Sequence, residues 1–361
     1  MNVLVIGGGM IGSLIAEELS CNYIVTVVDN NDERLDRIKN RNQKIQCLNL
    51  DIKKDDVITL LESTNLAVNC LPGFMGFKML EKIIGSKVSC VDISFMPENI
   101  MDLSEMAKNN GCIIIPDAGV APGLSNLIAG NLVANNNINE IQIMVGGLPK
   151  EKNPPWNYKA PFSPIDVIEE YTREARKRVN GNEETKPALS EKFLLDVEGI
   201  GELEAFLTDG LRTLLDDNGA LTDVPNLAEY TIRYPGHCNL VKKMLEEGKF
   251  SESNIDSTCK ELFKLWKLEE DEEEFTFMLI IATKNNGEVI SYTVFDERTN
   301  GWSSMSRTTG LTACALAKLI LNGKIEDKGV IPPEIIGMES KLYTFVLEYL
   351  KEKGISIESH H

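Results

Sequence analysis

Residues 3–12 read Val-Leu-Val-Ile-Gly-Gly-Gly-Met-Ile-Gly and decide the fold of the N-terminal part of this chain. The four apolar residues predict a buried strand, and the glycines after it form a Gly-x-Gly-x-x-Gly turn that leads into a helix. Gly7 permits the tight turn, Gly9 leaves the backbone open to a diphosphate, and Gly12 lets the helix lie close to the strand. The stretch therefore predicts a strand–turn–helix that binds a dinucleotide.

An acidic residue at the end of the second predicted strand indicates which dinucleotide binds. Met10 and Ile11 begin the helix, so the phosphates meet free N–H groups and the positive end of the helix dipole. Asp29 lies 22 residues after the first glycine of the motif, where its carboxylate accepts hydrogen bonds from ribose hydroxyls and repels a 2′-phosphate. Asn30 follows it, and no basic residue occurs before Arg34. NAD is therefore the predicted cofactor; NADP, an adenylate or flavin, and glycines that serve packing alone are the alternatives.

Short apolar runs alternate with helical segments as far as residue 118. Runs without polar alternation indicate strands that are buried on both faces, as in a parallel sheet covered by helices. Right-handed crossovers then predict an α/β fold with a doubly wound, Rossmann-type parallel sheet. The predicted strands are Val3–Ile6, Ile24–Val28, Ile45–Leu48, Leu66–Cys70, Val88–Val91 and Cys112–Ile115, and two of the predicted helices are Ile11–Leu19 and Phe77–Ile84.

Loops that leave the carboxyl ends of these strands are expected to border the cofactor, because ligands of open parallel sheets bind at that edge. The turn after the fourth strand should pass the nicotinamide ribose, and the polar residues after the fifth strand should lie near the nicotinamide. Asp51 is placed to border the adenine, with a surface turn as its alternative, and Asp92 has a helix N-cap or a turn acid as its alternative. The cofactor-binding candidates from these loops are Asp51, Ile52, Cys70, Leu71, Pro72, Asp92 and Ser94.

The composition excludes several classes of partner. The formal net charge of −18 argues against nucleic acid, which needs a basic surface. No run of 18 uncharged apolar residues occurs, so we expect no membrane span. The eight cysteines form no Cys-x-x-Cys pair and no cluster with histidine, which predicts buried thiols, no metal site and a reducing compartment, the cytoplasm.

The chain length and the pattern after residue 118 predict a second domain. We expect a dinucleotide-binding domain at residues 1–118, a mixed α/β domain for substrate binding and dimerisation at 119–304, and helices at 305–361 that pack back on the first domain. Residues 149–164 are rich in proline and aromatic residues, which predicts a long loop. The second domain should also contain a helix at Leu124–Ala134 and a strand at Ile141–Val145 that ends at Gly146-Gly147. A solvated acidic turn is expected at Glu269–Glu274, before a hairpin of Phe275–Thr283 and Glu288–Phe295. Two C-terminal helices are expected at Leu311–Leu321 and Lys341–Lys353.

The hairpin also predicts an oligomer. Asn286-Gly287 between two strand-like runs favours a tight hairpin turn. Such a hairpin leaves an edge strand with which a second subunit can pair. We therefore expect a homodimer.

Several long motifs resemble the saccharopine dehydrogenase family, and in particular its lysine 6-dehydrogenase branch. The resemblance extends over nearly the whole chain. Its pieces are Asp117–Leu124 (DAGVAPGL), Gly146–Pro149 (GGLP), Gly201–Leu214 (GELEAFLTDGLRTL), Tyr230–Asn239 (YTIRYPGHCN) and Gly329–Glu334 (GVIPPE).

The resemblance implies an NAD-dependent oxidoreductase that oxidises a carbon–nitrogen bond of lysine or of a lysine-derived adduct. Fungal saccharopine reductases have an aspartate before the Pro-Gly of the first motif, where this chain has Ala121. This departure favours free lysine, whose oxidative deamination releases ammonia. The alternatives are a saccharopine or other secondary-amine dehydrogenase and a non-catalytic protein that binds NAD.

The resemblance also implies catalytic residues. Arg233 and Arg212 are expected to bind the substrate carboxylate, and His237 is the leading general acid/base because its ordinary pKa is near neutral. Tyr158 and Lys159 lie on the proline-rich loop, which is expected to close over the substrate. Asp92 completes the catalytic candidates, and Glu202 and Asp209 are candidates for holding the substrate ammonium. Each has a structural alternative: a turn cap for His237, ion pairs for Arg212 (with Asp209) and Arg233, an interface for Tyr158 and solvation for Lys159.

Overall fold

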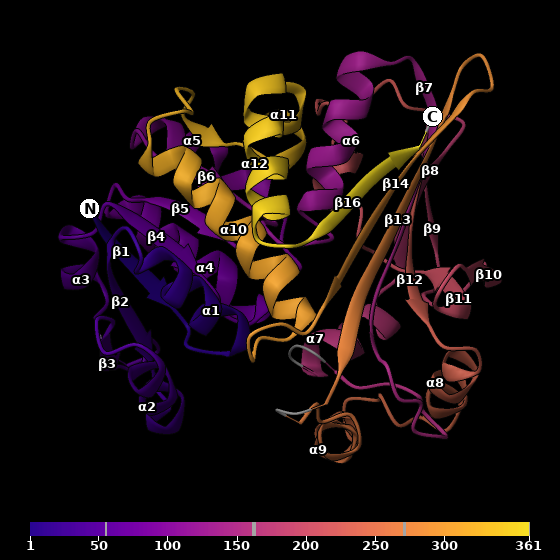
Figure 1. The fold of residues 1–361 in the computed structure, drawn as a ribbon, viewed down its shortest axis with the longest axis horizontal. Coiled ribbons are helices and arrows are strands. Elements are labelled where there is room, and N and C mark those ends of the chain that lie inside the picture. The colour runs from indigo at the N-terminus through magenta and orange to yellow at the C-terminus, as the bar shows by residue number, and fades with distance from the viewer. Residues whose placement is uncertain (55, 161–163, 270–271, 361) are drawn as a thin grey trace. The chain divides into compact units, whose positions relative to one another are not determined.

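The computed structural model describes residues 1–54, 56–160, 164–269 and 272–360. The chain divides into two compact units (Figure 1). The first contains Met1–Asn131 and Ser306–Lys353, and the second contains Leu132–Met305 and Gly354–His361. The first unit therefore passes the predicted boundary at residue 118, and the predicted segment 305–361 is divided between the units.

The first unit contains the predicted doubly wound sheet. In spatial order the strands are β15 (Gly329–Val330), β6 (Ile113–Ile115), β5 (Ser89–Asp92), β4 (Leu66–Asn69), β1 (Asn2–Ile6), β2 (Ile24–Asp29) and β3 (Gln46–Asn49). All the strand pairs are parallel, and the central strands β1, β4, β5 and β6 are largely buried, whereas the edge strand β3 is mostly exposed. The added edge strand β15 comes from the C-terminal part of the chain and pairs with β6, which the sequence pattern alone did not predict.

The helices of this unit connect the strands and cover them. They are α1 (Met10–Leu19), α2 (Asp32–Arg41), α3 (Ile58–Glu62), α4 (Gly73–Gly85), η1 (Ile100–Leu103), α5 (Ser104–Asn109), α6 (Leu124–Asn135), α10 (Ser304–Leu321), α11 (Pro333–Met338) and α12 (Ser340–Glu352). Helix α10 begins at Ser304, earlier than the predicted Leu311. Within the described ranges, no helix combines the length and the apolarity that a membrane crossing requires.

Two close approaches explain why the first unit extends beyond residue 118. A Cβ atom on Gly130 of α6 would collide with the carbonyl oxygen of Glu334, so α6 lies directly against α11. Asn126 donates to the buried carboxylate of Glu334 across the same contact. A Cβ on Gly310 of α10 would lie 2.8 Å from the side chain of Leu14 in α1, so the C-terminal helices pack on the dinucleotide-binding fold as expected.

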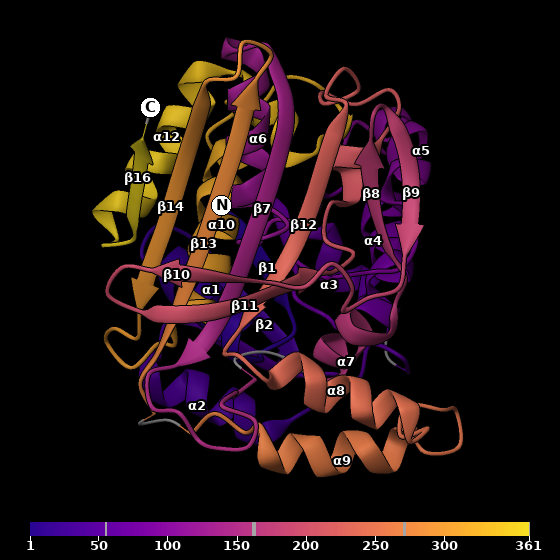
Figure 2. The ribbon, with the colours of Figure 1, turned by 90° about the vertical axis from the view of Figure 1, so that its right-hand side faces the viewer.

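The second unit is built on a mixed sheet whose longest strands lie side by side (Figure 2). The β12–β7 pair is parallel and the other pairs are antiparallel. Its spatial order is β10 (Phe193–Val197), β11 (Gly201–Leu207), β12 (Asn226–Arg233), β7 (Ile138–Pro149), β13 (Glu274–Lys284), β14 (Val289–Glu297) and β16 (Ser356–His360), with β8 (Ala175–Val179) and β9 (Asn182–Lys186) attached through β12. Its helices are α7 (Pro164–Thr172), η2 (Arg212–Leu215), α8 (His237–Glu246) and α9 (Ile255–Leu265).

Two sequence predictions in this unit are wrong for physical reasons. The strand predicted to end at Gly146 continues to Pro149, because that glycine serves a close approach: a Cβ on it would collide with the carbonyl oxygen of Ile232 in β12. Glu274 was assigned to a solvated acidic turn, yet it is 1% exposed at the start of β13. Its carboxylate accepts a hydrogen bond from the N–H of Ser304 at the start of α10. Residues 270 and 271 of that acidic run lie outside the described residues.

The predicted hairpin around Asn286-Gly287 is confirmed as β13 and β14. Its second strand is not an edge, because β14 also pairs with the C-terminal strand β16. The edge on which the homodimer prediction was based is therefore occupied within the chain, and the homodimer stays a prediction.

Candidate functional site

In the glycine turn of the first unit, the space beside Gly9 is open, whereas neighbouring backbone atoms fill the space beside Gly7 and Gly12. Gly7 has φ +103°, and a Cβ on it would lie 2.7 Å from the carbonyl oxygen of Cys70. A Cβ on Gly12 would collide with the carbonyl oxygen of Gly7, so this glycine is required for α1 to lie against β1. A Cβ on Gly9 would meet no atom within 4 Å. The space beside Gly9 is where a diphosphate can approach the backbone.

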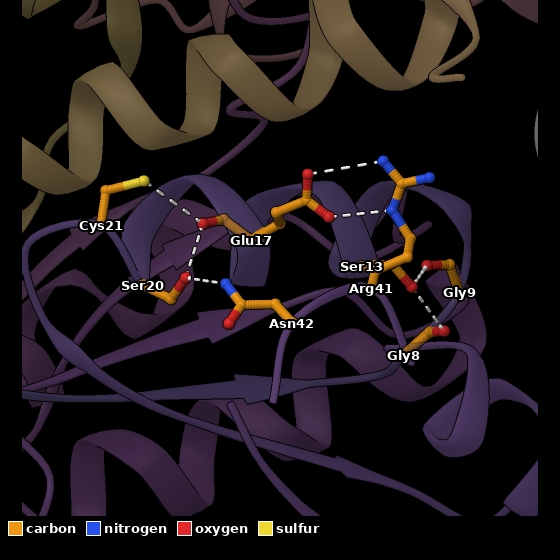
Figure 3. Close-up of polar contacts among 8 residues, drawn as sticks. All are labelled: Gly8, Gly9, Ser13, Glu17, Ser20, Cys21, Arg41 and Asn42. Carbon is orange, nitrogen blue, oxygen red and sulfur yellow. Dashed lines mark hydrogen bonds and ion pairs between the residues drawn. The ribbon is translucent and has the colours of Figure 1, made fainter. Parts of the chain in front are cut away.

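The start of α1 has the donors that a diphosphate needs. Gly9 is the N-cap residue and supplies no side-chain cap, so the first-turn N–H groups, which include those of Met10 and Ile11, have no intrahelical acceptor. The Ser13 hydroxyl donates to the carbonyl oxygens of Gly8 at 3.0 Å and Gly9 at 2.7 Å, so both carbonyls have a partner on the helix (Figure 3). The residues at this turn therefore fit a bound dinucleotide.

Asp29 ends β2 and is 8% exposed. Its two oxygens accept hydrogen bonds from the N–H of Gly8 at 2.7 Å and of Asn31 at 2.9 Å. A carboxylate offers about four acceptor positions, so positions for ribose hydroxyls remain. Arg34 lies 3.5 Å from the same carboxylate, with its side chain half-exposed. Sequence reasoning treated Arg34 as too far along the chain, whereas α2 brings it to the carboxylate; Asn30, beside Asp29, is exposed.

The remaining cofactor candidates lie at the carboxyl edge of the sheet with different surroundings. Asp51 lies in a turn, where its carboxylate accepts from the N–H of Lys53 and forms an ion pair with Lys54 at 3.1 Å. These contacts agree with the surface turn that was its structural alternative. Cys70 lies against Gly7, and Pro72 precedes α4 as its N-cap residue. Ile52 and Leu71 pack on the apolar core of this unit.

Asp92 is fully buried at the end of β5. Its carboxylate accepts from Asn69 Nδ2 at 2.6 Å and from Ser94 Oγ at 2.8 and 2.9 Å. Burial raises the pKa of Asp92 to about 7 despite these hydrogen bonds. No helix starts directly after it, so the N-cap alternative is wrong, whereas the turn-acid alternative agrees with the hydrogen bonds from Ser94, two residues further on. A Cβ on Gly76 of α4 would collide with Ser94 Oγ, which shows how tightly α4 holds this loop.

The raised pKa of Asp92 predicts a pH-dependent gain of stability on substitution. The folded-state pKa of about 7 exceeds the ordinary value of 3.8, so ionisation of Asp92 opposes folding. This penalty is absent below pH 4, develops between pH 4 and 7 and is complete above pH 7. Asp92→Asn should therefore be more stable than the wild type at pH 8, by on the order of 1–4 kcal/mol, and nearly equal at pH 4. Urea unfolding at both pH values checks this, with the exposed Asp102→Asn as control. An equal difference at both pH values would contradict the prediction.

In the second unit, Arg233 lies within a cluster of aromatic side chains. Its Nε donates to the hydroxyl of Tyr171 at 3.0 Å, and its Nη1 donates to the carbonyl oxygen of Ile232 at 2.9 Å. Its Nη2 has longer contacts, both 3.5 Å, with the hydroxyl of Tyr158 and the carboxylate of Glu170. The guanidinium also lies over the Tyr158 ring, 4.4 Å from its centroid. The sequence candidates Arg233 and Tyr158 are thus in contact.

His237 is the first residue of α8 and belongs to the same cluster. Its Nε2 lies 2.9 Å from the Tyr171 hydroxyl, and its Nδ1 lies 3.2 Å from the carbonyl oxygen of Trp156. Burial, and next the charge of Arg233, lower the pKa of His237 to about 3. The acid/base role of His237 was predicted from a near-neutral pKa. That premise is wrong, because the side chain is 1% exposed and lies next to the Arg233 cation.

Lys159 follows Tyr158 on the proline-rich loop but does not join the cluster. Its ammonium donates to the carbonyl oxygen of Lys267 at 2.9 Å and pairs with Glu272 at 2.8 Å. The structural alternative of a merely solvated lysine is wrong, since this side chain is 16% exposed and paired. Residues 161–163 of the predicted loop lie outside the described residues; its residues 150–160 contain no helix and no named strand, as predicted.

The candidates of the third motif are placed apart from one another. Asp209 forms an ion pair with Arg176 at 3.0 Å. The structural alternative was an ion pair of Asp209 with Arg212. Arg212 begins the short helix η2 with φ +52°. Glu202 is exposed on β11. The structure thus unites Arg233, His237 and Tyr158, and it does not place Lys159 or Asp209 among them.

Sequence reasoning missed two members of the cluster. Tyr171 of α7 contacts both Arg233 and His237, and Trp266 packs edge-on against Tyr158, with ring centroids 5.3 Å apart. Tyr171 belongs to none of the quoted motifs, and Trp266 follows a helix that the sequence pattern did not reveal. The one available signal was the concentration of aromatic residues in the adjoining proline-rich loop.

Comparison with known proteins accounts for both units. Residues 3–115 match the family model described as "Saccharopine dehydrogenase NADP binding domain", and residues 119–355 match "Saccharopine dehydrogenase C-terminal domain". Alpha-aminoadipic semialdehyde synthase, mitochondrial, from Rattus norvegicus is 22% identical over 444 residues, covering 98% of this chain and 47% of that protein. The Mus musculus protein of the same name is 21% identical with the same coverage. The chain therefore spans about half the length of these relatives.

A solved structure shares the fold. Apo histidine-tagged saccharopine dehydrogenase (L-Glu forming) from Saccharomyces cerevisiae superposes with a TM-score of 0.79, 16% identity and coverage of 99% of both chains. This likeness supports the predicted α/β architecture of an N-terminal parallel sheet followed by a mixed sheet. The two family models together extend over nearly the whole chain. The chain belongs to the saccharopine dehydrogenase family and has an NAD(P)-binding domain.

Proposed function

We propose that this protein is an NAD-dependent oxidoreductase that oxidises the carbon–nitrogen bond at the ε-carbon of lysine, as a lysine 6-dehydrogenase does. The observation that carries the redox part is the open position at Gly9 above the uncapped start of α1, with Asp29 beside it. The family assignment supports chemistry at a carbon–nitrogen bond. The departure at Ala121 supports free lysine over a glutarate adduct.

The contacts of Arg233 support an amino-acid substrate. Its Nε and Nη1 are held by acceptors at 3.0 and 2.9 Å, but its Nη2 has contacts of 3.5 Å, at the limit of a hydrogen bond. The Glu170 carboxylate on that side is 24% exposed. A substrate carboxylate that takes its place would form charge-assisted bonds of about 2.8 Å. Arg233 is therefore assigned to the α-carboxylate, with Arg212 as a second candidate.

The substrate amine must lose a proton before its carbon can be oxidised. Its ordinary pKa is about 10.4, and an ammonium has no lone pair with which to expel a hydride. Bound NAD⁺ supplies the hydride acceptor. Asp92 stays a predicted catalytic residue, and its buried carboxylate accepts hydrogen bonds from Asn69 and Ser94.

A second candidate activity is the oxidation of saccharopine or another secondary amine. The saccharopine dehydrogenase family models that match both parts of the chain, and the structural likeness to the yeast saccharopine dehydrogenase, favour it. The two activities differ in their products: lysine deamination releases ammonia, whereas an L-Glu-forming reaction releases glutamate. NADH formation with lysine or with saccharopine, together with assays for both products, distinguishes them. NAD binding without turnover of either amine would overturn the proposed enzyme and leave the non-catalytic alternative.

The preference for NAD over NADP is a separate prediction. Asp29→Ala removes the carboxylate that accepts from ribose hydroxyls and repels a 2′-phosphate, and it leaves Arg34 in place. We expect NAD⁺ to bind roughly tenfold more weakly, because one charged hydrogen-bonding group is lost, and the NAD⁺/NADP⁺ ratio of kcat/KM to fall. Arg34→Ala is the matched control and should not improve NADP⁺. An unchanged ratio in Asp29→Ala would contradict the ribose role.

A further inference from the structure

The hydrogen bonds between the proline-rich loop and Arg233 can run in one direction only. The carbonyl oxygen of Trp156 is an acceptor, so His237 Nδ1 must donate to it. The imidazole is fully buried beside a guanidinium and is therefore neutral, which leaves its Nε2 as an acceptor. The Tyr171 hydroxyl must then donate to Nε2 and accept from Arg233 Nε, which carries a proton permanently.

The same chain of contacts joins four separate segments. Trp156 belongs to the loop, Tyr171 to α7, His237 to α8 and Arg233 to the end of β12. The start of α8 is itself fixed, because the N–H of Cys238 donates to the carboxylate of Glu204 at 3.1 Å. Glu204 is the backbone register partner of Arg233 in the antiparallel pairing of β11 with β12. The positions of His237 and Arg233 therefore both depend on these two strands.

We propose that Tyr171 and His237 are positioning residues that fix the plane of the Arg233 guanidinium for a substrate carboxylate. This inference rests on the proposed function, in which Arg233 binds that carboxylate. Nε and Nη1 are both held, which leaves the guanidinium little rotational freedom and presents Nη2 to the Glu170 side. His237 holds the Tyr171 hydroxyl in its acceptor orientation and takes no proton from the substrate.

Tyr171→Phe removes the one oxygen that contacts both Arg233 and His237. We expect KM for the amino acid to rise roughly tenfold, as for loss of a hydrogen bond to a charged group, while kcat changes less and the Kd for NAD⁺ is unchanged. The matched control is Tyr234→Phe, which deletes a buried hydroxyl that donates to the carbonyl oxygen of Pro149 at 3.0 Å. Both variants should lose stability, but only Tyr171→Phe should change KM. A wild-type KM in folded Tyr171→Phe overturns the inference.

Substitutions of His237 separate a positioning role from proton transfer. His237→Leu leaves the Tyr171 hydroxyl without its acceptor and should raise KM, whereas His237→Gln supplies an amide oxygen near the place of Nε2 and should restore much of it. The pH dependence of kcat should be that of the wild type in both variants. Loss of one limb of the pH profile, with a kcat that glutamine does not restore, would make His237 an acid or base and overturn the positioning role.

Failure of the proposed function has a different signature. If the wild type neither oxidises nor binds lysine or saccharopine in calorimetry with NAD⁺ present, the proposed function and this inference fall together. If the wild type turns over either amine, the KM comparison decides the inference alone. Imidazole ¹⁵N shifts of His237 give a readout independent of substrate: a protonated Nδ1 and bare Nε2 are expected in the wild type, and a protonated Nε2 would overturn the directed network.

Discussion

A Gly9→Val variant should keep the fold of the nucleotide-binding unit and lose its affinity for dinucleotides. The backbone at Gly9 is extended, with φ −68° and ψ −171°, which any L-residue adopts without strain. A Cβ there meets nothing within 4 Å, so the valine side chain enters empty space. That space is the one a diphosphate must occupy to reach the N–H groups at the start of α1. We expect the Kd for NAD⁺ to rise by about 100-fold or more, since displacement removes several charge-assisted hydrogen bonds at once.

Gly12→Ala is the contrasting substitution. Its Cβ would collide with the backbone oxygen of Gly7, which no side-chain movement relieves, so α1 must shift away from β1. This variant should lose stability as well as binding. Calorimetric titration with NAD⁺ and with NADP⁺, beside thermal melting by circular dichroism, separates the two effects. Wild-type affinity in folded Gly9→Val would mean that the diphosphate binds elsewhere, and the redox assignment would lose its basis.

The nucleotide-binding unit was predictable because its determinants are local. The glycine turn, the short apolar strands and Asp29 all lie within about one strand–helix–strand unit, where spacing along the chain translates directly into position. What the sequence could not reveal here are contacts between distant segments. Strand β15 joins this sheet from residues 329–330, a contact that has no signature in periodicity. One short-range contact was missed as well, because α2 brings Arg34, five residues after Asp29, to its carboxylate.

The substrate-binding candidates show the opposite case. Arg233 and His237 were found through the family resemblance and Tyr158 through the proline-rich loop, yet Tyr171, which connects the first two, lies 62 residues before Arg233. These segments come together through long-range strand pairing, in which β12 pairs with β7, β11 and β8. Burial is equally non-local: His237 carries an ordinary side chain, and its low pKa comes from the aromatic rings and the cation around it. Glu274 was misread for the same reason, since an acidic run indicates charge and not exposure.

Arg233→Lys should lower kcat/KM for the amino-acid substrate by about 100- to 1,000-fold. A lysine ammonium has its three N–H donors on one nitrogen atom, so it cannot reach at once the positions that the separate guanidinium nitrogens reach at Tyr171, at the Ile232 carbonyl and at a carboxylate. Truncation of a buried, hydrogen-bonded charge pair costs about 2–5 kcal/mol, or roughly 30- to 5,000-fold, and the expected loss lies in the middle of that range. The Kd for NAD⁺ should be unchanged, because no nucleotide-binding candidate lies in the second unit. Steady-state kinetics on the NAD⁺-saturated protein, together with a nucleotide titration, measure both quantities.

Arg178→Lys is the control that distinguishes carboxylate binding from simple loss of a buried cation. Arg178 is 4% exposed and Arg233 is 3% exposed, and both lie in the second unit. The guanidinium of Arg178 donates to the carbonyl oxygens of Leu221 at 2.6 Å and Leu215 at 3.2 Å, so it orders a loop. Both lysine variants should therefore unfold at lower urea concentration, but only Arg233→Lys should lose turnover below its midpoint. Equal kinetic losses in the two variants would mean that Arg233 supports the fold of this unit and that the substrate carboxylate is bound by another residue, with Arg212 the next to test.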